Sequence, residues 1–82
     1  GDSASANVTT YKNTTNKSYL RLRVLRGKTA VTNYQNVNAV TKYRLKYKAD
    51  KSVMTGQSFK LRGYVAEGVT KGTGTMKGVF QP

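Results

Sequence analysis

Three stretches of the chain alternate cationic and apolar side chains with a period of two, which is the periodicity of a β-strand. They cover residues 19–24, 42–48 and 58–65 and have the sequences YLRLRV, KYRLKYK and SFKLRGYV. Because successive side chains of a strand point to opposite faces, each stretch sends its apolar residues to one side and its cations to the other. If the strands share one sheet, one face is a core and the other is cationic.

Turn residues separate these stretches at short intervals, and no segment shows helical periodicity. We expect strands at about 7–12, 18–26, 29–33, 40–49, 58–66 and 74–80, with a polar loop or irregular strand over 33–38. The chain is therefore predicted to be all-β, as a small antiparallel β-sandwich or a partly open barrel of five to seven strands. Residues 1–6 are expected to form a flexible tail, and residues 7–82 a single domain.

The sequence allows more specific predictions for two glycines and one pair of apolar residues. Gly27 lies between two segments that suit strands, and we expect it to supply the positive φ of a hairpin turn. Gly63 takes an inward position in its strand, which predicts a bulge or the close approach of another element. Val53 and Met54 are expected to cover an edge of the core.

The charge of the chain is strongly unbalanced. Its 82 residues include 15 Lys and Arg but only 3 Asp and Glu, which gives a formal net charge of +12. A magnitude of about 2–8 is enough to keep a small domain soluble, and a larger excess destabilises the compact state by self-repulsion. The excess therefore favours a function that involves a negatively charged partner.

The composition argues against catalysis. Cysteine and histidine are both absent, which excludes disulfides, zinc-ribbon sites and the most common general base of enzymes. The carboxylates are Asp2, Asp50 and Glu67, and Asp2 falls in the expected tail. We therefore expect no enzymatic activity, cofactor or metal site. No apolar run approaches the roughly 18–20 residues of a membrane-spanning helix.

The outward-facing cations of the three alternating strands form the predicted anion-binding site. A surface that served only to solvate and protect a sheet would mix both signs, because like charges on paired strands destabilise each other. Tyr19 and Tyr64 fall on the same side and could stack on the bases of a nucleic acid. The predicted anion-binding residues are Arg21, Arg23, Lys42, Arg44, Lys46, Lys48, Lys60 and Arg62.

The chain resembles small, cysteine-free, Asn/Thr/Tyr-rich β-sandwich proteins that Gram-positive bacteria export. The resemblance covers most of the chain and lies in three segments: Ala4-Ser5-Ala6, which has the form read by signal peptidases, the stretch TGQSFKLR at 55–62, and the stretch GVFQP at 78–82. It implies a secreted, bacteriocin-like antimicrobial protein. It assigns no functional residues.

Two classes of partner fit the cationic face. In the first, the protein is secreted and acts on the anionic surfaces or polymers of a cell envelope. In the alternative, it is a nucleic-acid-binding domain that contacts phosphates with the same face, although outward aromatic residues are few and no RNP-type signature is present. An acidic protein partner would leave the same pattern in the sequence.

Overall fold

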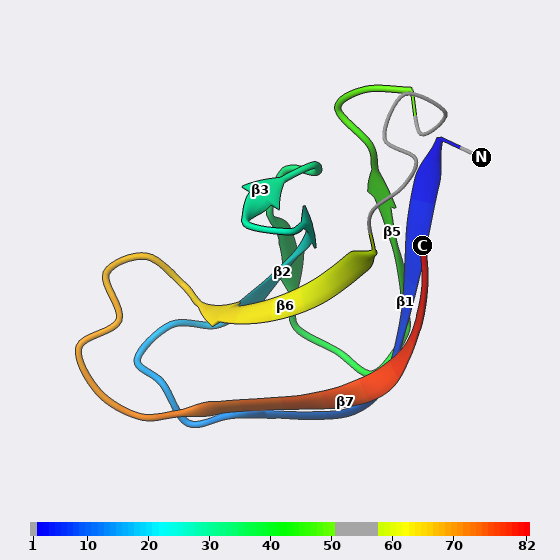
Figure 1. Ribbon diagram of the computed structural model, residues 1–82. Coiled ribbons are helices and arrows are strands. Elements are labelled where there is room, and N and C mark those ends of the chain that lie inside the picture. Colours follow the sequence, from blue (N-terminus) through cyan, green and yellow to red (C-terminus); the bar gives the residue numbers. More distant parts are fainter. Residues whose placement is uncertain (1, 51–57) are drawn as a thin grey trace.

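The computed structural model describes residues 2–50 and 58–82, which form two antiparallel sheets packed against each other (Figure 1). The all-β prediction is confirmed. Within the described residues, no helix is long and apolar enough to cross a membrane. The strands are β1 (Ser3–Asn13), β2 (Leu20–Arg26), β3 (Thr29–Ala30), β4 (Gln35–Val37), β5 (Lys42–Lys46), β6 (Phe59–Val65) and β7 (Gly74–Gln81).

Each sheet is built around one long central strand. In the first sheet β1 lies between β5 and β7. In the second sheet β2 pairs with β6 over its whole length, and its other side pairs with β4 at one end and β3 at the other. β1, β5 and β7 thus form the first sheet and β2, β3, β4 and β6 form the second, so β2 and β5, which both carry the period-two pattern, are not neighbours.

The two sheets are joined by hydrogen bonds on one side and open on the other. Thr32 forms an isolated antiparallel bridge with Tyr47, and the amide of Lys48 donates to the carbonyl of Val31 at 2.8 Å. On the opposite side, β6 and β7 are both edge strands, and no ladder joins them in the part of the chain that is described. The result is a partly open barrel with its opening between β6 and β7.

The core lies between the sheets and follows the period-two pattern. β2 contributes Leu20, Leu22 and Val24, each at most 4% exposed, while Arg21 and Arg23 between them remain half-buried. The inward residues of the other elements complete one continuous apolar layer. This layer includes Ala4, Ala6, Val8, Val31, Val37, Leu45 and Tyr47.

The first strand begins earlier than the sequence analysis predicts. β1 starts at Ser3, so the expectation of a flexible tail is wrong for residues 3–6. The physical reason is that Ala4 and Ala6 are both only 1% exposed and pack in the core, while Ser3 and Ser5, which alternate with them, face outward. Backbone pairing holds this segment as well, since Ser3 to Ala6 pair with β5 and Ser5 and Ala6 also pair with β7.

Two loops, residues 14–19 and 66–73, pair with each other at the end of the molecule away from the termini (Figure 1). The amide of Thr14 donates to the carbonyl of Thr73, and the amide of Thr73 donates to the hydroxyl of Thr14, both at 2.9 Å. The amide of Thr70 donates to the side-chain oxygen of Asn16 at 3.1 Å. These bonds tie the β1–β2 connection to the β6–β7 connection.

Both specific glycine predictions are confirmed. Gly27 has a φ of 61° in the turn between β2 and β3, where Arg26 and Thr29 pair. A Cβ atom at Gly63 would lie 3.1 Å from Cε of Met76, so the missing side chain leaves room for the Met76 side chain from β7. The predicted covering role of Val53 and Met54 lies outside the described residues.

Candidate anion-binding site

The outer face of the β2–β6 pair carries three of the predicted arginines. Arg21 and Arg23 project from β2 on the face opposite to Leu20, Leu22 and Val24, because side chains alternate along the strand. The antiparallel register places Tyr64 directly opposite Arg21 and Arg62 directly opposite Arg23. The pairing thus brings together three cations and one aromatic ring that lie about forty residues apart in sequence.

Tyr34 joins this group from the segment just before β4. Cζ of Arg21 lies 3.9 Å from the centroid of the Tyr34 ring, and Cζ of Arg23 lies 4.5 Å from it. The rings of Tyr34 and Tyr64 meet edge to face, with centroids 5.2 Å apart and an interplanar angle of 88°. We call Arg21, Arg23, Arg62, Tyr34 and Tyr64 the Arg–Tyr cluster.

The Tyr64 ring contacts two of the three arginines of the cluster, Arg23 and Arg62. Cζ of Arg23 lies 4.8 Å from its ring centroid and Cζ of Arg62 lies 5.4 Å from it. These distances are within the roughly 6 Å over which an aromatic quadrupole attracts a cation. The two rings therefore partly offset the mutual repulsion of three guanidinium groups that have no acidic residue on β2, β4 or β6 beside them.

Hydrogen bonds fix two of the guanidinium groups by one nitrogen each. Nε of Arg21 donates to the carbonyl of Val65 at 3.0 Å, and Nε of Arg23 donates to the hydroxyl of Tyr64 at 2.9 Å. Among the described residues, no hydrogen bond involves the terminal Nη groups of these arginines. Each side chain is thus held at Nε and over a ring, while its terminal donors stay available to an acceptor.

The eight predicted anion-binding residues do not form one surface, so the single cationic face is a wrong prediction. Lys42, Arg44 and Lys46 are on β5 in the other sheet, and Lys48 follows that strand. They are exposed beside small polar residues of β1, because Lys46 pairs with Ser3 and Arg44 with Ser5. Only Arg21, Arg23, Lys60 and Arg62 share the outer face of one sheet. The physical reason is that β5 pairs with β1, not with β2 or β6.

The two tyrosines predicted to stack have different surroundings. Tyr64 is part of the cluster, whereas Tyr19 is half-buried immediately before β2 and makes none of the cluster's ring contacts. Tyr34 is missing from the predicted site because residues 33–38 show no clean period and suggest only a polar loop or an irregular strand with no assigned face. Only the structure shows that Tyr34 is an aromatic residue that is 41% exposed and lies beside Arg21 and Arg23.

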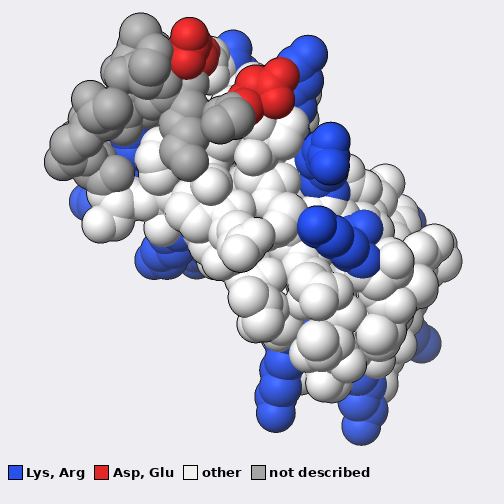
Figure 2. Space-filling view, turned by 90° about the vertical axis from the view of Figure 1, so that its right-hand side faces the viewer, with Lys and Arg blue, Asp and Glu red and all other residues white. Residues whose placement is uncertain are grey.

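Outside the cluster, the described residues include few acidic side chains. Seen from the side of β1 and the C-terminal end of β7, Lys and Arg project around a largely uncharged surface, and the acidic side chains visible on this face lie at one end (Figure 2). No group of His, Cys, Asp or Glu among the described residues could hold a metal ion. Tyr47 has a raised pKa because its ring is desolvated by burial, and it lies in the core, away from the cluster.

The arrangement can bind oxyanions without a pocket, by presenting guanidinium donors on a fixed aromatic support. Comparison with protein-family models, with curated proteins and with solved structures finds no match for the chain.

Proposed function

We propose that the protein is a secreted, cationic, bacteriocin-like protein that binds phosphate-bearing polymers of a cell envelope through the Arg–Tyr cluster. The observation that carries the proposal is the support of three guanidinium groups by two tyrosine rings, with the closest contact at 3.9 Å. Guanidinium groups match phosphate and carboxylate oxygens in a planar, bidentate geometry that a lysine ammonium does not offer.

Arg21 and Arg23 are held in place before a ligand binds, and this favours phosphate binding in addition to their positive charge. A free arginine side chain loses about 1.5–2 kcal/mol of rotamer entropy when it is immobilised. Arg21 and Arg23 are already held by their Nε hydrogen bonds and by Tyr34, so less of this entropy remains to be lost when a phosphate binds. Their terminal Nη groups then act as the donors.

The same contacts favour a phosphate polymer over base recognition. Base stacking requires an open aromatic face. The Tyr34 ring carries Arg21 and Arg23 and packs edge to face with the Tyr64 ring, which carries Arg23 and Arg62. A nucleic acid would therefore meet the cluster mainly through its backbone, as any polyphosphate would.

The cations of β5 supply a second contact area for a long polymer. Lys42, Arg44 and Lys46 are exposed on the other sheet and, unlike the cluster arginines, have no aromatic support among the described residues. Their contribution is a diffuse, salt-sensitive attraction. A polymer that bends around the domain can use both areas, whereas a short anion is expected to bind only the Arg–Tyr cluster.

Titration at two salt concentrations tests the proposal. The probes are poly(glycerol phosphate), single-stranded DNA, double-stranded DNA and vesicles that contain phosphatidylglycerol. We expect poly(glycerol phosphate) to bind at least as tightly as DNA of equal charge, and replacement of Arg21 and Arg23 by Lys to weaken it although the charge is kept. A clear preference for single-stranded DNA, or equal binding by the Lys variant, would refute recognition of envelope phosphate by this cluster.

A further inference from the structure

The three arginines of the Arg–Tyr cluster are not equivalent. Arg23 and Arg62 are directly opposite each other in the β2–β6 ladder, whereas the residue opposite Arg21 is Tyr64. Side chains at directly opposite positions of an antiparallel pair have Cβ atoms about 4.5–5.5 Å apart, and two like charges there repel each other. Cζ of Arg23 and Cζ of Arg62 also contact one ring, that of Tyr64, at 4.8 Å and 5.4 Å from its centroid. Two positive charges are therefore concentrated at this pair.

A hydroxyl donor lies beside the two guanidinium groups. The Tyr64 hydroxyl oxygen accepts a hydrogen bond from Nε of Arg23 at 2.9 Å, so its own hydrogen remains to be donated. Among the described residues, that hydrogen has no acceptor, and the guanidinium of Arg62 makes no hydrogen bond. Arg62 is exposed and Tyr64 is half-buried, so an anion can approach them from solvent. The Nη groups of Arg23, the guanidinium of Arg62 and the Tyr64 hydroxyl together form a set of donors.

A phosphate monoester matches this set of donors better than a phosphodiester does. A monoester group has three terminal oxygens and carries a charge of about −1.5 to −2 at pH 7, because its second pKa is near 6. A diester has fewer terminal oxygens and a single charge. The monoester can therefore accept hydrogen bonds from both guanidinium groups and from the Tyr64 hydroxyl, and its charge offsets both of the opposed cations, Arg23 and Arg62.

We propose that Arg23, Arg62 and the Tyr64 hydroxyl bind the phosphomonoester end of a phosphate polymer, and we call these three groups the terminal-phosphate site. This inference rests on the proposed function and assigns positions within the same cluster. Arg21 lies two residues along β2 from Arg23, a rise of about 6.6–6.8 Å. The three-carbon glycerol unit between successive phosphates is long enough to span that rise. Arg21 therefore binds the phosphodiester next to the terminal phosphate, which orients the chain along β2.

Binding at the terminal-phosphate site should depend on pH through the ligand. Protonation of the terminal phosphate below its second pKa, near 6, removes one of its charges. The chain contains no histidine, the side chain that ordinarily titrates between pH 5 and 8. On the elements around the site, β3 and β4 carry no charge, and the other charged or titratable groups are Arg21 on β2, Lys60 on β6, Tyr34 before β4 and Glu67 in the loop after β6. Glu67→Gln should therefore keep the pH profile of the unmodified protein.

Oligomers that differ only at one end test the site. The first probe is a short oligo(glycerol phosphate) that ends in a phosphomonoester, and the second is the same oligomer after a phosphatase has removed that group. The third is a hydroxyl-ended oligomer that is two units longer, which restores the total charge. We expect the first to bind about tenfold tighter than the third at pH 7.5, and at most about twofold tighter at pH 5. Equal affinity at pH 7.5, or a preference that does not change with pH, would overturn the proposal.

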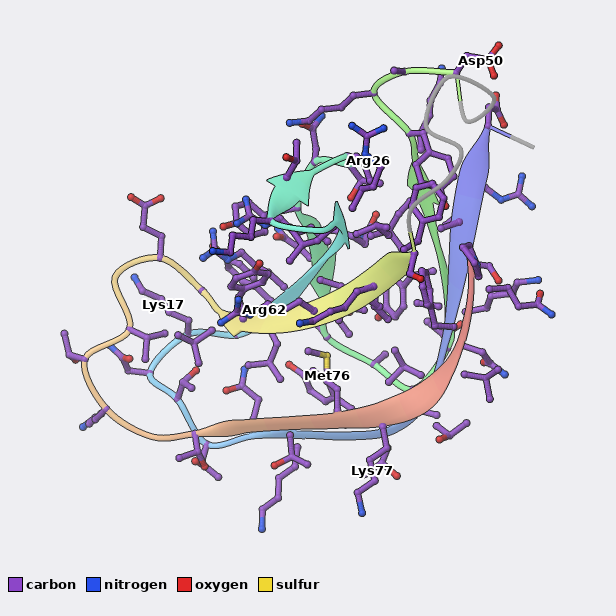
Figure 3. All side chains as sticks on the ribbon, in the orientation of Figure 1. Lys17, Arg26, Asp50, Arg62, Met76 and Lys77 are labelled. Atoms are coloured by element: carbon purple, nitrogen blue, oxygen red, sulfur yellow. The ribbon has the colours of Figure 1, made fainter. Side chains whose placement is uncertain are left out.

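Single substitutions assign the preference to named groups. Arg62→Gln and Lys77→Gln each remove one positive charge, and Lys77 is exposed on β7, where Figure 3 shows it projecting away from β6 and Arg62. Arg62→Gln should lower the tenfold preference to about twofold, and Lys77→Gln should keep it. Tyr64→Phe keeps the ring but not the donor and should lower the preference by about threefold, whereas Tyr19→Phe, outside the cluster, should not. An unchanged preference in Arg62→Gln would refute the terminal-phosphate site.

The failure of this site and the failure of the proposed function give different results. If hydroxyl-ended oligomers bind and the phosphomonoester end adds nothing, the proposed function stands and the terminal-phosphate site is refuted. If glycerol 3-phosphate binds and neither oligomer binds more tightly, the reverse holds. Soluble dihexanoyl phosphatidic acid presents the same phosphomonoester on a lipid and should bind no more tightly than glycerol 3-phosphate. Tighter binding of this lipid than of the phosphomonoester-ended oligomer would assign the site to a lipid headgroup and overturn the assignment to a polymer end.

Discussion

Arg23 lies directly opposite Arg62 in the β2–β6 ladder, and both guanidinium groups contact the ring of Tyr64. Two like charges at directly opposed positions destabilise a sheet, and a single change of sign would remove the repulsion. Tyr64 offsets part of this cost but not all of it, since cation–π attraction at exposed sites is only about 0.5–1 kcal/mol. The domain thus keeps a locally unfavourable pair on its outer surface, as expected of a surface used for binding.

Arg62→Glu should therefore raise stability and lower polymer affinity at the same time. The new carboxylate faces Arg23, so we expect the free energy of unfolding to rise by up to about 1 kcal/mol. Urea unfolding measures the first effect and titration with poly(glycerol phosphate) the second. Lys71→Glu, at an exposed loop position, is the matched control for net charge. Equal loss of affinity in both variants would contradict a localised site.

Tyr34 should act through its ring and not through its hydroxyl. Tyr34→Ala removes the support of Arg21 and Arg23, so we expect weaker polymer binding by about fivefold and a loss of stability of about 1 kcal/mol. Tyr34→Phe keeps the ring and should behave like the unmodified protein in both measurements. The prediction is wrong if the Phe variant loses affinity to the same degree as the Ala variant.

Leu45 should be one of the most sensitive core positions. It is 3% exposed in β5 and packs in the continuous apolar layer between the sheets. Leu45→Ala should lower the free energy of unfolding by about 2–5 kcal/mol. Val79→Ala, at a residue that is 61% exposed, should change it by less than about 0.5 kcal/mol. Thermal unfolding of the two variants checks the difference, which would vanish if Leu45 were not part of the core.

Gly72 and Gly68 provide a matched pair for the contact between the two loops. Both have positive φ, 86° and 83°, so an alanine at either position is strained by about 1–2 kcal/mol. A Cβ atom at Gly72 would also collide with the backbone of Thr14, whereas one at Gly68 would meet only the flexible side chain of Lys17, at 3.5 Å. Gly72→Ala should therefore destabilise the protein clearly more than Gly68→Ala in urea unfolding. Similar losses would argue against the close loop contact.

Tyr47 should make stability depend on pH in the alkaline range. Burial raises its pKa above the ordinary value of 10.0, so the folded state holds the phenolic proton more tightly than the unfolded state does. Stability is then fully present below pH 10 and falls as the pH rises through the folded pKa. Comparing urea unfolding of the unmodified protein and Tyr47→Phe from neutral to alkaline pH isolates this effect.

The Phe variant should lack that part of the fall and should be no less stable at neutral pH. The hydroxyl of Tyr47 is buried and has no hydrogen-bond partner among the described residues, so its removal leaves no acceptor or donor unsatisfied. A strongly destabilised Tyr47→Phe variant would indicate that the hydroxyl has a structural role.

The period-two pattern of residues 19–24, 42–48 and 58–65 is enough to predict the strands, the core faces and the exposed sides of β2, β5 and β6. It does not say which strands pair. That choice depends on contacts between segments far apart in sequence, and β5 pairs with β1, whose inward residues are small. For the same reason, the predicted eight-residue surface divides between two sheets.

The sequence indicates other parts of the fold only weakly or not at all. Alternation in Ser3-Ala4-Ser5-Ala6 continues the pattern of β1, but alanine and serine contrast too little in hydropathy to mark a strand. Tyr34 enters the Arg–Tyr cluster from an irregular segment, and its position depends on the β2–β4 register. Periodicity could predict the cations of the site but not the aromatic ring that orders them.

The pairing of β1 with β7 also has a consequence for the time course of folding. Asn13 pairs with Gly74, and Ser5 pairs with Gln81. The central strand of the first sheet, β1, therefore completes its pairing only when it meets β7, which is far from it in sequence. Such pairings are slow to form because a long loop must close before they contribute. The first sheet cannot be completed during synthesis until β7 has emerged, so the chain should reach its folded state only late.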